Sequence, residues 1–242
     1  MGTQALSARA AALALAIWLA VPAQALAHRD DYIDETFVYQ TLAAHERELE
    51  GWAEVHAGRD RRPQFWYTGA FEWGLTSRWT LDAASQWLHR EGATTFGRLR
   101  SETRYRFSEE GRRPIDMAAS LEYELETKNV TGEDNEATIT PRLVLSRDLS
   151  RSWNTTVNLD FPVAISGGGL EFQYAIGTRY PAEGFLRVGT EFKQTPGERS
   201  AVLFPQVWFA LPDEMTLKLG VGIGLAREDD PVNARAAFEA EF

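Results

Sequence analysis

Apolar and polar residues alternate with a period of two through almost the whole chain from Glu46 onward. Along FWYTGAFEWGL, for example, the apolar side chains of Tyr67 and Trp73 share one parity and Glu72 lies on the other. Such alternation is the pattern of a β-strand whose two faces meet different surroundings, because successive side chains point to opposite sides. Stretches rich in Gly, Pro, Asp, Asn and Ser separate the runs. The sequence therefore predicts long strands joined by turns.

Twelve strands are predicted, at residues 46–56, 64–75, 78–89, 95–107, 114–126, 136–146, 152–163, 169–180, 185–194, 200–211, 215–226 and 233–242. An even number is typical of single-chain bacterial outer-membrane barrels, and most of the strands have the length of about 10 residues that a tilted strand needs to cross a membrane. A soluble β-sandwich also alternates, but it does not usually join so many long strands by short links without a Greek-key crossover. The predicted fold class is thus all-β: a closed up-and-down antiparallel transmembrane β-barrel over residues 46–242.

Aromatic residues of the outward parity are expected to form two bands if both termini lie in the periplasm. The periplasmic band comprises Trp73, Trp79, Tyr105, Phe107, Trp153, Tyr180, Phe209 and Phe242, and the opposite band comprises Phe65, Tyr67, Trp87, Tyr123, Phe161, Phe172 and Phe192. Outward residues between the bands are mostly Leu, Val, Ile, Ala, Gly and Thr. Aromatic rings favour the headgroup level of a bilayer, so this banding indicates a barrel embedded in a membrane with its lipid as a partner.

The chain ends in ARAAFEAEF, an alternating segment that stops on Phe242. The period predicts a closing strand whose last outward residue is Phe242. A C-terminal Phe on an alternating strand resembles the terminal signature of Gram-negative outer-membrane barrels. That resemblance implies that Phe242 is an assembly signal read by the barrel-assembly machinery.

The first residues are typical of an export signal. A weakly basic stretch containing Arg9 precedes the apolar run AALALAIWLAV, which is shorter than the roughly 20 residues that span a bilayer. The sequence Ala25-Leu26-Ala27 matches a signal-peptidase site. We therefore expect a signal peptide at 1–27, a cleaved chain exported to the cell outer membrane, and an N-terminal segment at 28–45 that lies in the periplasm or plugs the lumen.

Composition narrows the remaining classes. The chain has no Cys, which leaves an exported protein without disulfides, and no second long apolar run that would form a transmembrane helix. Its formal net charge of -10 argues against a nucleic-acid partner. No residue pattern points to a cofactor, so none is predicted.

Charged residues concentrate on the inward parity. The predicted lumen lining is Arg98, Arg100, Glu102, Arg104, Arg106, Asp116, Glu122, Glu124, Arg142, Asp160, Glu171, Arg187, Glu191, Lys193, Arg235 and Glu239. Between strands 95–107 and 114–126, the predicted pairs are Arg106 with Asp116, Arg100 with Glu122, and Arg98 with Glu124, since opposite charges across a ladder stabilise it. Two interpretations stay open: a charged core that holds the barrel together, or a narrow polar path whose charges tune selectivity.

One inward wall is built from small residues. Gly220, Gly222 and Gly224 are inward in strand 215–226, with Gly177 and Gly189 nearby. An inward Gly makes room for another element that comes close. The inward side chains of Phe204 and Trp208 could fill that space, and so could segment 28–45.

Catalytic and metal-binding patterns are weak. Ser85 and His89 share an outward face but lie about 13 Å apart along a strand, whereas a base must lie about 3 Å from its nucleophile. The cluster HRDD with Asp34 and Glu35 lacks the fixed spacing of a metal site. We therefore predict no catalytic residue, no metal site and no enzyme activity.

Several segments show a family likeness. YIDETFVY (32–39), ELEGWAEV (48–55), FEWGLTSRWTLD (71–82), RYRF (104–107), LEYE (121–124) and LSRDLSRSWNTTVNLDF (145–161) resemble the MetA-type phenol-degradation family of outer-membrane transporters. The resemblance implies a transport role. The predicted function is a narrow pore or transporter for small solutes with a charged lumen. The alternatives are a closed structural or assembly barrel and, less favoured, a membrane-embedded lipid-modifying enzyme.

Overall fold

The computed structural model describes residues 31–34, 36–58, 62–108, 113–150, 152–226 and 229–242. The predicted signal peptide at 1–27 lies outside these residues. The strands are β1 (Arg47–Ala57), β2 (Gln64–Thr76), β3 (Trp79–Arg90), β4 (Ala93–Arg106), β5 (Asp116–Glu126), β6 (Glu136–Ser150), β7 (Trp153–Asp160), β8 (Val163–Ala164), β9 (Gln173–Tyr180), β10 (Leu186–Thr195), β11 (Ser200–Leu211), β12 (Met215–Gly224) and β13 (Val232–Glu241). A single turn of helix, α2 (Lys128–Thr131), lies in the link between β5 and β6. Within the described residues, no helix is long and apolar enough to cross a membrane.

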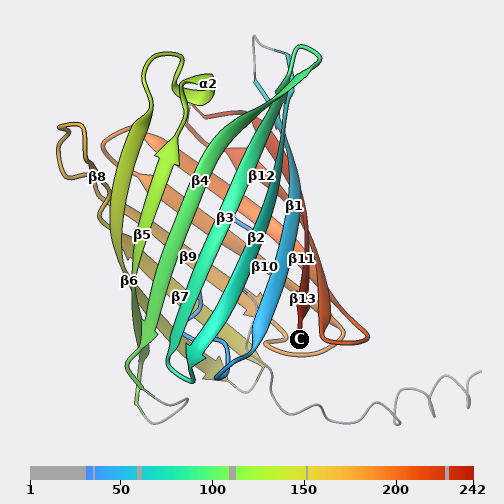
Figure 1. The fold of residues 1–242 in the computed structure, drawn as a ribbon. Coiled ribbons are helices and arrows are strands. Elements are labelled where there is room, and N and C mark those ends of the chain that lie inside the picture. The colour runs from blue at the N-terminus through green and yellow to red at the C-terminus, as the bar shows by residue number, and fades with distance from the viewer. Residues whose placement is uncertain (1–30, 35, 59–61, 109–112, 151, 227–228) are drawn as a thin grey trace, which may run out of the picture.

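The strands close into a barrel (Figure 1). Twelve of the thirteen strands each pair antiparallel with two neighbours, and the pairings β5–β6 and β1–β13 leave no open edge among them. The thirteenth, β8, adds a two-residue pairing to β6. The predicted fold class, a closed antiparallel β-barrel of about twelve strands, is confirmed. We call the end at which β1 begins and β13 ends the proximal rim, and the opposite end the distal rim.

Strand boundaries agree with the prediction to within a few residues, except around the link from β7 to β9. The sequence predicted strands at 152–163 and 169–180, whereas β7 ends at Asp160 and β9 begins at Gln173. Pro162 has no amide hydrogen to give the ladder, and the run Gly167 to Gly169 does not favour strand. These residues explain why regular pairing stops and why only the short β8 forms between them.

Both predicted aromatic bands face outward. In the proximal band, Trp79, Tyr105 and Phe107 are 42–45% exposed, and their rings pack against one another in sequence. In the distal band, Phe65 and Tyr67 are likewise exposed. Large apolar side chains also cover the outer wall between the bands. A continuous apolar surface of this kind is unfavourable in contact with water. This outer surface is suited to lipid.

The C-terminal residue belongs to the barrel closure. The Phe242 amide donates to the Arg47 carbonyl at 2.9 Å, and the Arg47 amide donates to the Phe242 carbonyl at 3.1 Å. The Phe242 ring is 60% exposed on the outer face at the proximal rim. Closure of the ladder and placement of this ring therefore depend on the same residue.

Deleting Phe242, or changing it to Asp, is expected to reduce the yield of assembled barrel far more than Phe238→Leu, which keeps an apolar side chain on the same strand and face. The Phe242 variants lose the outward ring at the membrane interface. The measurement is the folded fraction in outer membranes, read from the shift between unheated and heated gel bands. Similar yields for the three variants would contradict this role.

The register between β4 and β5 differs from the prediction. The observed Cα partners are Arg98 with Glu126, Arg100 with Glu124, Glu102 with Glu122, and Arg106 with Ala118. Asp116, the first residue of β5, instead accepts a hydrogen bond at 3.1 Å from the Oγ of Ser108, which lies in the link before this strand. A slip by two residues keeps every side chain on its own face, so alternation cannot distinguish the two registers. The predicted pairs were wrong for this reason, although the faces were right.

Exchanging Arg98 and Glu126, in the double variant Arg98→Glu with Glu126→Arg, is expected to recover most of the stability that either single reversal removes. The two side chains are 2.5 Å apart at the closest atoms. Because both are partly exposed, the coupling free energy should be on the order of 1 kcal/mol. Urea unfolding midpoints of the purified barrels measure it. The same exchange between Arg98 and Glu124 is the control, and equal recovery there would contradict the observed register.

Candidate functional site

The lumen holds the predicted charged residues, with one exception. Arg98, Arg100, Glu102, Arg104, Arg106, Asp116, Glu122, Glu124, Arg142, Asp160, Arg187, Glu191, Lys193, Arg235 and Glu239 all lie on strands with the inward parity. Glu171 does not: it precedes β9 and is exposed. The interruption of regular pairing after Asp160 carries it out of the barrel wall. No role in the lumen follows for Glu171.

Other lumen residues went unnoticed in the sequence. Glu48, Glu50 and Glu54 on β1 share the parity of Trp52 and face inward, and Lys218 on β12 is almost fully buried. The same period-two alternation could have identified them, because ELEGWAEV places its acidic residues on one face.

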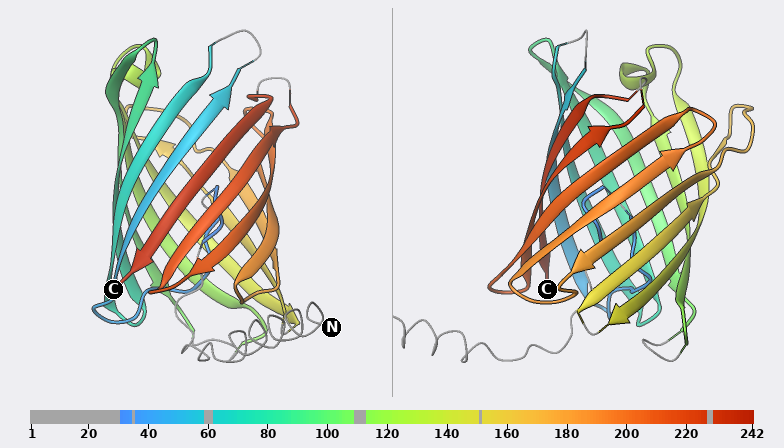
Figure 2. Two further views of the ribbon diagram at one scale, coloured as in Figure 1. Left: turned by 90° about the vertical axis from the view of Figure 1, so that its right-hand side faces the viewer. Right: turned by 180° about the vertical axis from the view of Figure 1, so that it is seen from behind.

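A segment before β1 runs inside the barrel, as Figure 2 shows. We call residues 31–34 and 36–45 the lumen segment. Most of its side chains up to Leu42 are buried: Tyr32 is 2% exposed, Val38 is 1% exposed and Leu42 is 0% exposed. The sequence left a periplasmic location and a lumen location open, and the described residues up to Leu42 lie in the lumen, whereas residues 43–45 are exposed.

Side chains of the barrel wall bind the backbone of the lumen segment. The Ile33 amide donates to Gln206 Oε1 at 2.8 Å. The amides of Asp34 and Thr36 donate to the two carboxylate oxygens of Glu191, at 2.7 and 3.1 Å. A backbone without regular secondary structure can be buried only when its polar groups find such partners. The wall therefore specifies the path of the segment.

Phe37 of the lumen segment is held through both its ring and its backbone. Its ring lies between two guanidinium groups, with the Cζ atoms of Arg104 and Arg142 at 4.0 and 4.3 Å from the ring centroid. Its amide donates to Asn158 Oδ1 at 2.8 Å, and its carbonyl accepts from Asn158 Nδ2 and Thr156 Oγ1, both at 2.9 Å. Cation–π contacts strengthen when the cation is removed from water, as it is here.

The same two arginines organise a buried ion-pair network. Arg142 lies 2.7 Å from both Glu102 and Asp160, and 3.7 Å from Glu122. Arg104 binds Asp31 of the lumen segment through two hydrogen bonds, at 2.8 and 3.2 Å. The network thus joins β4, β5, β6 and β7 to the lumen segment, and each cation is held by several acceptors as burial requires.

The space beside the small inward residues is filled both by the wall aromatics Phe204 and Trp208 and by the lumen segment. A Cβ on Gly177 would lie 2.7 Å from the Tyr32 ring, and one on Gly189 would lie 2.9 Å from the Trp208 ring. A Cβ on Gly220 would meet Phe204 at 2.5 Å and Ile33 at 3.0 Å. The glycines therefore make room for wall aromatics and the lumen segment together. Arg179 completes this region, with its guanidinium near the rings of Tyr32 and Trp208.

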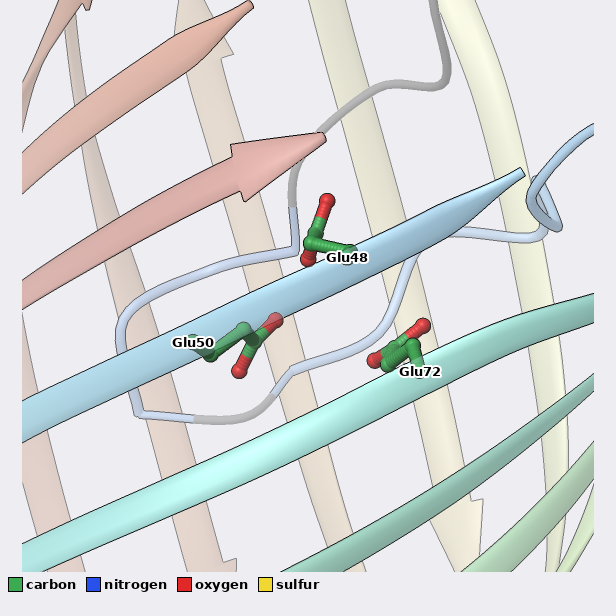
Figure 3. A group of neighbouring side chains, drawn as sticks. All are labelled: Glu48, Glu50 and Glu72. Atoms are coloured by element: carbon green, nitrogen blue, oxygen red, sulfur yellow. The ribbon is translucent and has the colours of Figure 1, made fainter. Parts of the chain in front are cut away.

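Acidic residues gather in the proximal half of the lumen. Glu48 and Glu50 on β1 and Glu72 on β2 place carboxylate oxygens within 4.8 Å of one another (Figure 3). Glu239 and Glu241 lie directly across from Glu50 and Glu48 on β13. We call these five glutamates the acidic patch. Lys218 forms an ion pair with Glu239 and offsets part of the charge.

A polar vestibule of 480 Å³ opens on the distal side of the lumen segment. Its lining includes Asp34, Trp52, Glu54, His56, Trp66, Gln86, Arg98, Arg100, Glu124, Lys193, Asp230, Asn233 and Arg235. Guanidinium groups cover both tryptophans: Arg98 lies 5.1 Å from the Trp66 ring and Arg100 lies 5.7 Å from the Trp52 ring. Asp34 contributes to the lining, so the lumen segment forms part of the inner end of the vestibule.

Hydrogen bonds hold the link between β12 and β13 at the vestibule mouth. His56 lies between Glu54 and Asp230, at 3.1 and 3.2 Å. Burial alone would raise the pKa of Asp229, but hydrogen bonds from Ser200 Oγ and from the amides of Ala226 and Ala201 lower it. This carboxylate is therefore charged at neutral pH and ties the link to β11.

Comparison with known proteins identifies the fold. No protein-family model matches the chain, and a sequence search of curated proteins finds no match. The KdgM porin structure superposes with a TM-score of 0.62 at 9% identity, covering 81% of this chain and 99% of that chain. The COG4313 outer membrane channel from Pseudomonas putida F1 gives 0.57 at 13% identity, covering 84% and 98%, and the NanC porin gives 0.56 at 9%, covering 80% and 97%. This chain therefore has the fold of outer-membrane β-barrel porins and channels.

Proposed function

We propose that this chain is an outer-membrane channel for small polar solutes, held shut in this conformation by the lumen segment. The observation that carries the proposal is the polar vestibule, which leads from the distal rim to an inner end formed partly by Asp34. Protein interiors that serve only as a core are close-packed, whereas this lumen contains an open space of 480 Å³ lined by charged residues. The proximal rim then faces the periplasm, and Phe242 serves the barrel-assembly machinery.

Opening requires the lumen segment to move, because its buried side chains fill the space between the vestibule and the proximal half. The wall residues that bind it are polar: Gln206, Glu191 and Asn158 can bind water once the segment leaves. Displacement therefore exchanges hydrogen bonds with the chain for hydrogen bonds with solvent. A channel with such a lumen can be closed by its own N-terminal segment and still conduct when that segment is displaced.

The acidic patch sets the expected selectivity. Carboxylates that line a narrow pore attract cations and repel anions. Glu48, Glu50 and Glu72 lie together, so once the open path is filled with water their carboxylates would act on the same part of it. We expect the open channel to prefer cations, and we expect Glu→Gln changes at these three positions to reduce that preference.

The proposal is tested by current recordings in planar bilayers. The intact mature chain should show rare openings, and a variant that lacks residues 31–42 should conduct continuously with a reversal potential that indicates cation preference. If neither form conducts, the chain is a closed structural barrel, which is the alternative function. Gel mobility before and after heating must show that the deletion variant still forms a barrel.

Motifs such as YIDETFVY and LSRDLSRSWNTTVNLDF support a narrower proposal, namely that the chain is related to the MetA-type phenol-degradation transporters. Exchange of residues 31–45 with the corresponding segment of a member of that family tests it, since a shared closing mechanism should leave the current unchanged.

A further inference from the structure

The link from β7 to β9 differs in composition from every other link at the distal rim. Residues 161–170, FPVAISGGGL, contain no charged side chain, and Glu171 is the first that follows. The other distal links are 58–63, 91–92, 127–135, 196–199 and 225–231, and each of them contains at least one charged residue. Links that face water and polar headgroups have charged or polar side chains. The uncharged link therefore points to different surroundings.

This link forms an irregular hairpin, which we call the apolar hairpin (residues 161–172). Val163 pairs with Ile139 on β6 and with Leu170 on the returning arm. Ile139 in turn pairs with Tyr123 on β5. Directly opposed residues of an antiparallel sheet share a face. The row from Tyr123 through Ile139 and Val163 to Leu170 therefore continues the outer face of the barrel onto the hairpin.

The apolar side chains of the hairpin are strongly exposed. Leu170 is 69% exposed and Ile165 is 55% exposed, and both exceed most residues of the lipid-facing wall. Glu171 has the parity opposite to that of Leu170 and Phe172, so its charge does not interrupt this face. In Figures 1 and 2 the hairpin beside β8 leans away from the barrel axis rather than covering the lumen.

The hairpin is continuous with the distal aromatic band. Phe161 and Phe172 pack with ring centroids 5.6 Å apart, Phe172 and Tyr174 are 6.1 Å apart, and Tyr174 and Phe192 are 6.2 Å apart. This chain of rings passes from the hairpin arms to β9 and β10 without a break. Since aromatic bands mark the bilayer interface, the base of the hairpin lies at that level.

We propose that the apolar hairpin is a lipid-binding element that lies on the barrel's flank and inserts Ile165 and Leu170 into the outer leaflet. The occupant is lipid rather than water, because ten consecutive uncharged residues replace the charges found in the other distal links. It is lipid rather than a second copy of the chain, because the exposed face continues the lipid-facing wall and its aromatic band. This contact is independent of whether the lumen conducts.

Single-cysteine spin labels test the proposal directly, because the chain has no native Cys to remove. Labels are placed at Ile165→Cys and Leu170→Cys in the mature chain, reconstituted into phosphatidylcholine–phosphatidylglycerol vesicles. Collision rates are measured with oxygen, which concentrates in lipid, and with a nickel chelate present on both sides of the membrane. Val188→Cys on the outer face of β10 is the lipid control, since Val188 is 49% exposed there. Gly197→Cys in the distal link from β10 to β11 is the water control, because a Cβ there meets no atom within 4 Å.

The oxygen-to-nickel ratio at Ile165 and Leu170 should resemble that at Val188 and be several-fold higher than that at Gly197. A ratio equal to that at Gly197 would overturn the proposal. Low collision rates with both reagents, together with spin–spin broadening that disappears on dilution with unlabelled chain, would also overturn it and assign the face to a second copy. A gel shift on heating must show that every labelled variant is a folded barrel.

Discussion

Phe37→Ala is expected to raise the open probability of the channel by about a hundredfold or more. Truncating a buried Phe costs about 3–5 kcal/mol, and each 1.4 kcal/mol changes an equilibrium tenfold. We expect the open and closed states of the channel to share the same barrel wall. The lost free energy therefore destabilises the closed state, in which the Cζ atoms of Arg104 and Arg142 lie 4.0 and 4.3 Å from the centroid of the Phe37 ring. Single-channel recordings in planar bilayers measure the open probability.

The control for this prediction is Phe65→Ala. Phe65 is 43% exposed on the outer face, so the same truncation there leaves the lumen segment untouched. Thermal unfolding should show that both variants remain folded. An open probability that stays at the wild-type value in Phe37→Ala would mean that the lumen segment does not close the path.

Arg142→Met is expected to destabilise the barrel by about 3–5 kcal/mol, because it leaves buried carboxylates without their cation. Arg142 lies 2.7 Å from Glu102 and from Asp160, and these acids are 5% exposed. Arg142→Lys keeps the charge but loses the planar fork that reaches several acceptors, so its effect should be intermediate. Urea unfolding followed by tryptophan fluorescence gives the free energies.

The matched control is Arg98→Met at the distal end of β4. Its ion pair with Glu126 is partly exposed, so the change should cost no more than about 1 kcal/mol. Adding Glu102→Gln to Arg142→Met should recover part of the loss, since it removes one uncompensated charge. Equal destabilisation by Arg142→Met and Arg98→Met would show that the buried network contributes no more than a surface pair.

The strands and their faces could be predicted because every strand of a barrel wall turns alternate side chains toward the lumen and toward the outside. Alternation assigned residues such as Glu102 and Arg142 to the lumen without knowledge of their partners. The register of β4 and β5 could not be predicted in the same way, since a two-residue slip puts Arg98 opposite Glu126 instead of Glu124 and changes no face.

The sequence patterns left the location of the lumen segment open for a different reason. It has no strand or helix period, and its partners are distant in the chain. Phe37, for example, binds Asn158 on β7 and lies between arginines from β4 and β6. Period-two alternation gives Asn158 the same face as Asp160, which was predicted to be inward, but it does not show what Asn158 would bind. Only closure of the barrel brings these residues together.

The contacts of the lumen segment also have a consequence for folding, because they join residues that are far apart in the chain. Its partners Gln206 and Glu191 lie 173 and 157 residues further along the chain than Ile33 and Asp34. Contacts of such long range form only after the intervening chain is in place. The described residues nearest the N-terminus are therefore expected to reach these contacts late in folding. If the wall closes before these contacts form, we expect water to occupy the space that the lumen segment later fills.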